Sequence, residues 1–210
     1  MKKLIIPLIT LLCLRMFADV GDVTFVAFDT ETTGFSPARE RIIEIGAVKY
    51  RNGKIIDSTH WLINPGIPVR NSHVHGITGY ELTGYPGFAD TYPAFRNFAG
   101  DAVLIAHNAS FDVRFMAAEI ERNNLDPMPN PVINSLTLFR RWYPEAGSHK
   151  LGLLAETLDI RVETTHRAEA DSETLLKILD HSLKARPDIT VQNIALTANG
   201  TYYFDGTRKK

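Results

Sequence analysis

The sequence has little of several features that mark particular classes of protein. Its one cysteine, Cys13, excludes an intramolecular disulfide and a metal site built from cysteines. The 23 basic residues are balanced by 24 acidic ones, so the chain lacks the overall basic field of a histone-like nucleic-acid binder. With 44% hydrophobic and 22% charged residues, the composition is that of a globular domain and excludes disorder and fibres. Because the chain has no overall basic field, any binding of nucleic acid must take place at a local site.

The apolar run near the N-terminus, residues 4–14, is too short to cross a bilayer. Because Lys2 and Lys3 precede it, the run resembles the core of a secretory signal, although Arg15 and Met16 stand where small residues usually lead to cleavage. Two hypotheses follow. A functional leader predicts a periplasmic or secreted protein, whereas a misassigned start with translation from Met16 predicts a cytoplasmic one. Neither hypothesis predicts a stable membrane association.

Hydrophobic patterns predict strands first and an alternation of strands and helices afterwards. Expected strands are residues 24–28, 42–50, 54–63, 102–106 and 132–133, the second and third joined by the hairpin pair Asn52-Gly53. Expected helices are residues 89–99, 109–122, 135–142, 150–158 and 168–184. This order predicts an α/β fold with a mixed five-stranded sheet and helices on both faces. The chain then divides into residues 1–18, a folded domain over 19–186, and a tail over 187–210 in which residues 189–196 and 201–204 form a small hairpin around Asn199-Gly200.

Two acidic residues share one face of the first expected strand. Asp29 and Glu31 follow Phe25 and Ala27 in the alternation of that strand, so the two carboxyl groups leave its end side by side. A lone Asp-x-Glu is usually only a strand running into a polar turn. Two further acids, Asp112 and Asp171, lie at helical positions and favour a functional role over this interpretation.

Asp171 lies on the apolar stripe that continues through Leu175 and Ile178, which places it on the buried side of its helix. Asp112 precedes Phe115 and Met116 at helical spacing and so faces inward as well. Buried carboxylates are costly unless they are paired or bound to metal, and no matching row of inward cations is present. Hard oxygen ligands suit magnesium or manganese, so a two-metal phosphodiester site accounts for these acids.

His166 is the histidine nearest to Asp171 in the chain. If both residues were helical, their side chains would be about 140° apart, so His166 is better placed on the loop that enters the helix. Its unperturbed pKa near 6.5 suits a general base at neutral pH. A lone loop histidine is more often only solvated, and the neighbouring acids are what favour a catalytic role here.

Three segments together resemble the motifs of the DEDDh 3'-5' exonucleases, a family that includes the epsilon-type proofreading exonucleases of bacterial replicative DNA polymerase. They are FDTETTG at residues 28–34, HNASFD at 107–112 and HRAEAD at 166–171. The likeness covers about residues 23–184 and includes IEIGAV at 43–48 and HGIT at 75–78. One such motif arises easily by chance, whereas three in order with spaced acids are highly specific.

The resemblance implies a ribonuclease H-like fold and an exonuclease domain over residues 19–186. It implies two divalent ions, Mg²⁺ or Mn²⁺, and His166 as the general base. The metal ligands it implies are Asp29, Glu31, Asp112 and Asp171. The substrate-binding residues it implies are Thr32, Phe35, Asn108 and His75, although a structural turn hydrogen bond is an equal alternative for His75. We interpret Glu44 as structural, and Asn134, where the family commonly has Asp, as a helix cap.

Three functions fit these residues. The first is a metal-dependent 3'-5' exonuclease that releases nucleoside 5'-monophosphates, mainly from single-stranded DNA, alone or as a DNA polymerase subunit. The second is an exoribonuclease with the same chemistry, since a 2'-hydroxyl is sensed by pocket contacts that the motifs do not specify. The third is a catalytically silent, polymerase-associated binding module, which the retention of four acids and His166 disfavours. The near-neutral charge fits a short single-stranded end better than long duplex.

Overall fold

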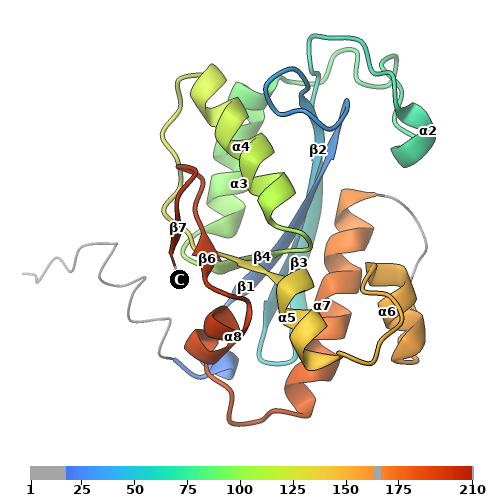
Figure 1. Ribbon diagram of the computed structural model, residues 1–210. Coiled ribbons are helices and arrows are strands. Elements are labelled where there is room, and N and C mark those ends of the chain that lie inside the picture. The colour runs from blue at the N-terminus through green and yellow to red at the C-terminus, as the bar shows by residue number, and fades with distance from the viewer. Residues whose placement is uncertain (1–17, 163–166, 210) are drawn as a thin grey trace, which may run out of the picture.

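A mixed sheet of seven strands runs through the computed structural model, which describes residues 18–162 and 167–209 (Figure 1). The strands are β1 (Phe25–Thr32), β2 (Ile42–Arg51), β3 (Lys54–Leu62), β4 (Val103–Ala106), β5 (Val132–Asn134), β6 (Thr201–Tyr202) and β7 (Arg208–Lys209). The helices are the 3-10 turn η1 (Val20–Asp22) and α2 (Ser72–His75), α3 (Phe88–Ala99), α4 (Ser110–Arg122), α5 (Ser135–Trp142), α6 (Leu151–Thr157), α7 (Ala168–Lys184) and α8 (Val191–Thr197).

The strand order is β3-β2-β1-β4-β5-β6-β7. β1, β2 and β3 form the expected antiparallel meander, and β4 and β5 add parallel to β1. Asn52 and Gly53 both have positive φ, 48° and 76°, as the tight turn between β2 and β3 requires. The carboxyl ends of β1, β4 and β5 therefore point to the same edge of the sheet, where polar groups from separate segments can meet.

Two hydrophobic layers cover the two faces of the sheet. Val26 and Phe28 of β1 pack with α3 and α4 on one side, while Phe25 and Ala27 pack with α6, α7 and α8 on the other. Figure 1 shows the same division, with α3 and α4 on one side of β1 and α7 on the other. Helices on both faces are thus confirmed. The alternation of β1 places Asp29 and Glu31 on the α7 side.

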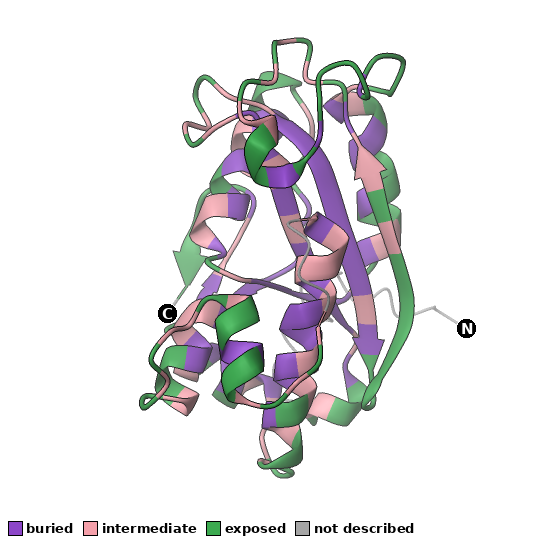
Figure 2. Cartoon of the chain, turned by 90° about the vertical axis from the view of Figure 1, so that its right-hand side faces the viewer, coloured by how far each residue is buried: buried purple, intermediate pink, exposed green. Residues whose placement is uncertain are grey.

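One long edge strand is solvent-exposed, as Figure 2 shows in green beside the buried central strands. This strand, β3, carries the charged residues Lys54 and Asp57 and the exposed His60. Charged side chains along an edge strand oppose pairing with another chain. The charged residues of β3 thus protect this edge of the sheet from pairing with another chain.

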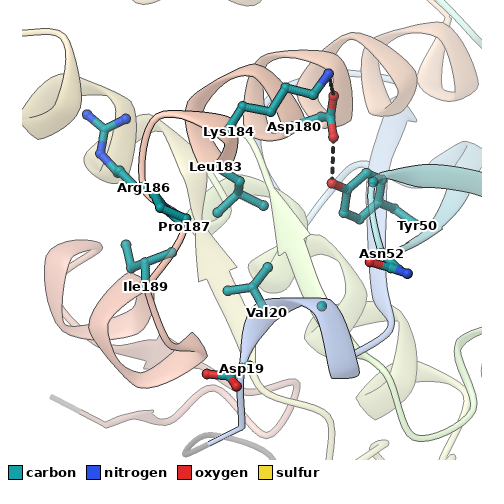
Figure 3. A pocket seen from close by; sticks show the side chains of 12 residues that line it. Asp19, Val20, Tyr50, Asn52, Asp180, Leu183, Lys184, Arg186, Pro187 and Ile189 are labelled. Carbon is teal, nitrogen blue, oxygen red and sulfur yellow. Dashed lines mark hydrogen bonds and ion pairs between the residues drawn. The ribbon is translucent and has the colours of Figure 1, made fainter.

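At the end of the sheet away from Asp29, α7 is tied to β2 (Figure 3). The Tyr50 hydroxyl donates a hydrogen bond to Asp180 at 2.7 Å, and Lys184 pairs with the same carboxylate at 2.7 Å. Val20 and Leu183 line a hollow of about 250 Å³ beside this contact. The contact holds the C-terminal half of α7 against β2.

Several sequence expectations need correction. The sheet has seven described strands rather than five, because β6 and β7 of the tail extend it beyond β5. Residues 189–196 are not a strand, since α8 occupies Val191–Thr197, and the terminal hairpin is formed by β6 and β7. β1 runs to Thr32 because β2 pairs with it over its whole length, so Asp29 and Glu31 lie within the strand rather than beyond its end.

Two predictions fall outside the described residues: the leader or alternative start over residues 1–15, and the loop position of His166. Ala18, which the sequence grouped with the leader, accepts a hydrogen bond from the backbone of Val191 at 3.3 Å. Among the described helices, none is both long and apolar enough to cross a membrane.

Candidate active site

Three carboxyl groups converge beside β1. Asp29 and Glu31 project from the same face of the strand, and Asp171 comes from the first turn of α7. One oxygen from each of the three side chains lies within 4.8 Å of the others. All three side chains are half-buried, so the cluster is open to solvent on one side and enclosed by protein on the other.

A glycine allows α7 to approach the sheet this closely. Gly46 of β2 lies directly opposite Asp29 in the strand register. A Cβ atom on Gly46 would overlap the backbone of Ala168 and Glu169. The hydroxyl of Ser172 also donates to the Gly46 carbonyl at 3.3 Å. The first turn of α7 therefore rests on bare β2 backbone, which places Asp171 beside the acids of β1.

A buried ion pair anchors the beginning of α7. Glu44, only 1% exposed, accepts hydrogen bonds from both Nε and Nη2 of Arg167, the shortest at 2.6 Å. The same carboxylate accepts from the backbone N–H of Ala168 at 3.2 Å and so caps the helix. The structural interpretation of Glu44 agrees with this geometry. Since Arg167 follows His166 directly in the chain, the anchor also holds the chain next to the predicted base.

The fourth predicted ligand, Asp112, lies next to this group but outside the 4.8 Å cluster. Its Oδ1 atom accepts hydrogen bonds from the Thr30 backbone N–H at 3.1 Å and from the Thr30 hydroxyl at 2.8 Å. Asp112 is 2% exposed in the first turn of α4, which agrees with the inward position predicted for it. These bonds tie α4 to β1 and fix one oxygen of the carboxylate.

The carboxyl groups oppose one another's ionisation. Burial raises the pKa of Asp29 well above its usual range, and the nearby Asp112 and Glu31 raise it further. Burial, followed by Glu44 and Asp171, raises the pKa of Glu31 to about 8. Burial also raises the pKa of Asp112 to about 7, although the hydrogen bonds from Thr30 act in the opposite direction. Each shift disfavours the charged form of its carboxyl group.

The loop after β1 and the turn around α2 form one wall of the site. The Asn71 amide donates to the Thr32 carbonyl at 2.8 Å, which joins the two segments. His75 is 4% exposed, and its Nδ1 accepts from the Ile77 backbone at 3.1 Å, so the predicted structural turn bond is present. Within the part of the chain that the structure describes, its buried Nε2 and the Asn71 Oδ1 atom have no hydrogen-bond partner. This wall therefore contains two polar atoms that are shielded from solvent.

Phe35 and Asn108 are the two remaining predicted substrate contacts. Phe35 is 84% exposed, directly after the turn that ends β1. Asn108 has φ of 60°, a left-handed conformation that asparagine tolerates, and it lines a groove that also contains Asp29 and Asp171. Exposed aromatic and amide groups at such positions are available for contact with a ligand.

Sequence reasoning missed two contributors to this arrangement. Gly46 lies in the IEIGAV segment, but only the packed helix reveals why a side chain cannot be present there. Asn71 precedes α2 without any recognisable motif. Asn134 was anticipated: its Oδ1 accepts from the Leu136 N–H at 3.1 Å, which confirms it as the cap of α5.

Comparison with known proteins gives consistent family matches. Residues 26–179, most of the chain, match the RNase_T family of exonucleases. The PolC-type DNA polymerase III of Clostridium perfringens is 40% identical over 168 residues, which cover 78% of this chain and 11% of the polymerase. The PolC-type enzyme of Halalkalibacterium halodurans is 41% identical over 165 residues, which cover 78% of this chain and 12% of that polymerase. This chain thus spans only a small part of these relatives' length.

Solved structures share the fold. Exonuclease X in complex with 5' overhanging duplex DNA superposes with a TM-score of 0.67 at 27% identity, covering 82% of this chain and 99% of that one. The nuclease domain of 3'hExo, a DEDDh family member bound to rAMP, superposes with a TM-score of 0.70 at 18% identity, covering 80% and 96%. The fold is therefore the ribonuclease H-like fold of DEDDh exonucleases. Together with the family match over most of its length, this means that the chain belongs to the RNase_T family of exonucleases.

Proposed function

We propose that this exonuclease hydrolyses phosphodiester bonds at the 3' end of DNA, mainly single-stranded DNA, and releases nucleoside 5'-monophosphates. The observation that carries the proposal is the convergence of Asp29, Glu31 and Asp171 within 4.8 Å, between β1 and the first turn of α7. Three carboxylates at this spacing suit a reaction that needs cations beside a phosphate group. Hydrolysis of a phosphodiester is such a reaction.

The donor set fits divalent metal ions. All the candidate ligands are carboxylate oxygens, which Mg²⁺ and Mn²⁺ prefer. Burial raises the pKa values of Asp29, Glu31 and Asp112, and neighbouring carboxylates raise those of Asp29 and Glu31 further, so a bound cation would stabilise the ionised groups. We propose two ions, held by Asp29, Glu31, Asp171 and Asp112. When bound, such ions activate the attacking water and stabilise the leaving 3'-oxygen.

The protein groups around the ions have separate roles in this proposal. Thr30 holds Asp112 in one orientation through two hydrogen bonds. Glu44 and Arg167 fix the beginning of α7 and thereby the position of Asp171. His166, adjacent to Arg167 in the chain, removes the proton from the attacking water; this role comes from the sequence motif. A positioned histidine base is suited to neutral pH.

The terminal nucleotide has a matching wall on one side of the acids. We propose that main-chain groups of Thr32 and the exposed ring of Phe35 hold it, with His75 near the substrate strand. An aromatic ring can stack on any base without reading its identity. Such a pocket is compatible with removal of successive nucleotides whatever the sequence.

DNA is the substrate we favour over RNA. The two PolC-type relatives compared above are DNA polymerases, and the exonuclease X structure, at 27% identity, is a complex with DNA. The runner-up is an exoribonuclease with the same catalytic residues. Because the matched region lies within PolC-type polymerases in those relatives, we further propose that this chain acts with a DNA polymerase as a proofreading component.

The test is incubation of the protein and Mg²⁺ with 5'-labelled single-stranded DNA, mismatched duplex and RNA, with products resolved by length. The proposal expects a ladder that shortens one nucleotide at a time from the 3' end, fastest on single-stranded DNA. A ladder only on RNA would favour the exoribonuclease. An absence of cleavage on all three substrates would favour the silent binding module.

A further inference from the structure

A second wall of the active-site cleft lies opposite the one assigned to the terminal nucleotide. A groove of about 780 Å³ begins at Asp29 and Asp171 and continues along the end of α5 and the start of α6. Figure 1 shows these two helices beside α7, on the α7 side of the sheet. The groove is lined by Asp29, His107, Asn108, Leu136, Arg140, Gly147, Ser148, His149, Lys150, Leu151, Gly152 and Asp171.

Two cations line this groove away from the acids. Arg140, in the last turn of α5, and Lys150, at the start of α6, are both exposed. Neither forms an ion pair or a side-chain hydrogen bond with any described residue, although other cations of the chain do, such as Lys177 with Glu173. Among the described residues of the lining, the only acids are Asp29 and Asp171, which belong to the catalytic cluster. Beyond that cluster, the charged side chains of the described lining are therefore positive.

The wall that carries Lys150 is held in place by hydrogen bonds. The His107 ring bridges the Ser135 hydroxyl at 2.9 Å and the His149 carbonyl at 2.9 Å. Burial lowers the pKa of His107 to about 4, so at neutral pH the ring is uncharged, donates from Nε2 to the carbonyl and accepts from Ser135 at Nδ1. The His149 ring in turn donates to the Tyr143 carbonyl at 3.0 Å. The groove thus exists before a ligand binds, which reduces the cost of ordering it.

We propose that this groove holds the substrate strand on the 5' side of the scissile bond, with Arg140 and Lys150 contacting its backbone phosphates. The inference rests on the proposed function. A strand whose scissile phosphate lies at Asp29 and Asp171 extends from them in two directions. Thr32, Phe35 and His75 take the terminal nucleotide on one side, and the remaining strand leaves across the other, where Arg140 and Lys150 lie. A single-stranded polyanion is the ligand that matches their charge.

The test compares wild-type protein with the double variant R140Q/K150Q in Mg²⁺, using oligothymidylate and the small ester thymidine 5'-p-nitrophenyl phosphate. The matched control is R51Q/K54Q, which removes exposed cations at the β2–β3 hairpin, at the other end of the sheet. Each phosphate contact on a single strand contributes about 0.7 to the log-log slope of affinity against salt. Losing two contacts lowers that slope by about 1.4. When the salt concentration is raised fourfold, the factor by which KM increases is therefore roughly sevenfold smaller in R140Q/K150Q than in wild-type protein.

The expected pattern is a raised KM and a flattened salt dependence on oligothymidylate, with unchanged kinetics on the ester and wild-type behaviour in R51Q/K54Q. An unchanged KM and salt slope on the oligonucleotide would overturn the assignment, as would equal losses on both substrates, because the two residues would then act on the fold or the chemistry. If wild-type protein hydrolyses neither substrate, the proposed function fails. Fluorescence anisotropy with labelled oligothymidylate then tests whether the groove binds a single strand. Equal affinity in wild-type protein and R140Q/K150Q would overturn the assignment of the groove.

Discussion

Gly46 of β2 and Ala168 of α7 are packed backbone to backbone, so closely that a Cβ atom on Gly46 would overlap the Ala168 carbonyl carbon. The first predicted effect follows from this contact. Gly46→Ala forces the first turn of α7 away from β2 and carries Asp171 away from Asp29. Overpacking of this kind costs roughly 1–3 kcal/mol, and we expect both a lower melting temperature and a large loss of nuclease activity.

The control for Gly46→Ala is Gly79→Ala, where the nearest atom to an added Cβ would belong to Val69 at 3.8 Å, an ordinary contact distance. Thermal unfolding and nuclease assays on both variants test the idea. Wild-type stability and turnover in Gly46→Ala would mean that the close approach of α7 does not position Asp171.

Glu44→Gln probes the anchor of α7. The variant keeps an oxygen for the Ala168 N–H but removes the charge that binds Arg167. Hydrogen bonds to charged groups contribute about 1.5–3 kcal/mol, so we expect a destabilisation of that order together with reduced turnover. Glu173→Gln, which breaks the exposed pair with Lys177, should change stability by less than about 1 kcal/mol. Equal melting temperatures for the two variants would contradict the anchor.

The carboxylate cluster predicts how stability depends on pH in a chelator. The pKa of Glu31 is raised from 4.5 to about 8 in the folded protein, so the folded state keeps a proton that the unfolded chain has lost. The free energy of unfolding therefore falls as pH rises between those values. Asp29 and Asp112, whose pKa values are also raised, act in the same direction.

Magnesium in excess should raise the melting temperature and flatten this dependence, because it binds the folded, ionised site. Glu31→Gln should flatten the profile in the chelator by removing one contributor. Melting curves across the pH range test both statements. A profile that rises with pH in the chelator would show that the acids do not repel one another as described.

Two variants distinguish the role of the proposed general base, His166, from that of a proposed metal ligand, Asp171. Asp171→Asn removes a proposed metal ligand, so the rise in melting temperature with Mg²⁺ and the turnover should both decrease. His166→Ala removes a proton acceptor but no ligand, so the Mg²⁺ effect should persist while turnover falls by roughly 10²- to 10⁴-fold. The acidic limb of its pH-rate profile should also disappear. Near-normal turnover in His166→Ala would remove this histidine from the mechanism.

Local patterns predicted much of the fold and the position of the acids. The helices over 135–142 and 168–184 match the observed bounds, because their apolar spacing and flanking residues leave few alternatives. The alternation of β1 placed Asp29 and Glu31 on one face, since a strand's period of two does not depend on its partners. The motif-bearing part of the site was thus accessible from sequence.

The strand expected over residues 189–196 of the tail was predicted wrongly for a physical reason. Its β-branched residues and the Asn199-Gly200 pair suggested a hairpin, but Val191, Ile194 and Ala195 follow a helical period and are buried. The Thr190 side chain and Asn193 form a capping box that begins α8. Helical spacing and a cap outweighed β-propensity here. Strands of two residues, such as β6 and β7, leave almost no pattern to detect.

Tertiary contacts account for what the sequence did not reveal. The clash at Gly46, the ion pair between Glu44 and Arg167, and the groove beside Arg140 and Lys150 each join segments far apart in the chain. Nothing in the local pattern distinguishes these residues from a solvated charge or a strand glycine. Only their arrangement in space gives them a role.

The most direct test of the central claim, that Asp29, Glu31 and Asp171 form a metal-dependent 3'-5' exonuclease site, is the time course of 5'-labelled single-stranded oligothymidylate with Mg²⁺, resolved to single nucleotides. We predict stepwise shortening from the 3' end that stops in excess chelator and is lost in Asp171→Asn. Undiminished cleavage in the chelator or in Asp171→Asn, or products released from the 5' end, would contradict the claim.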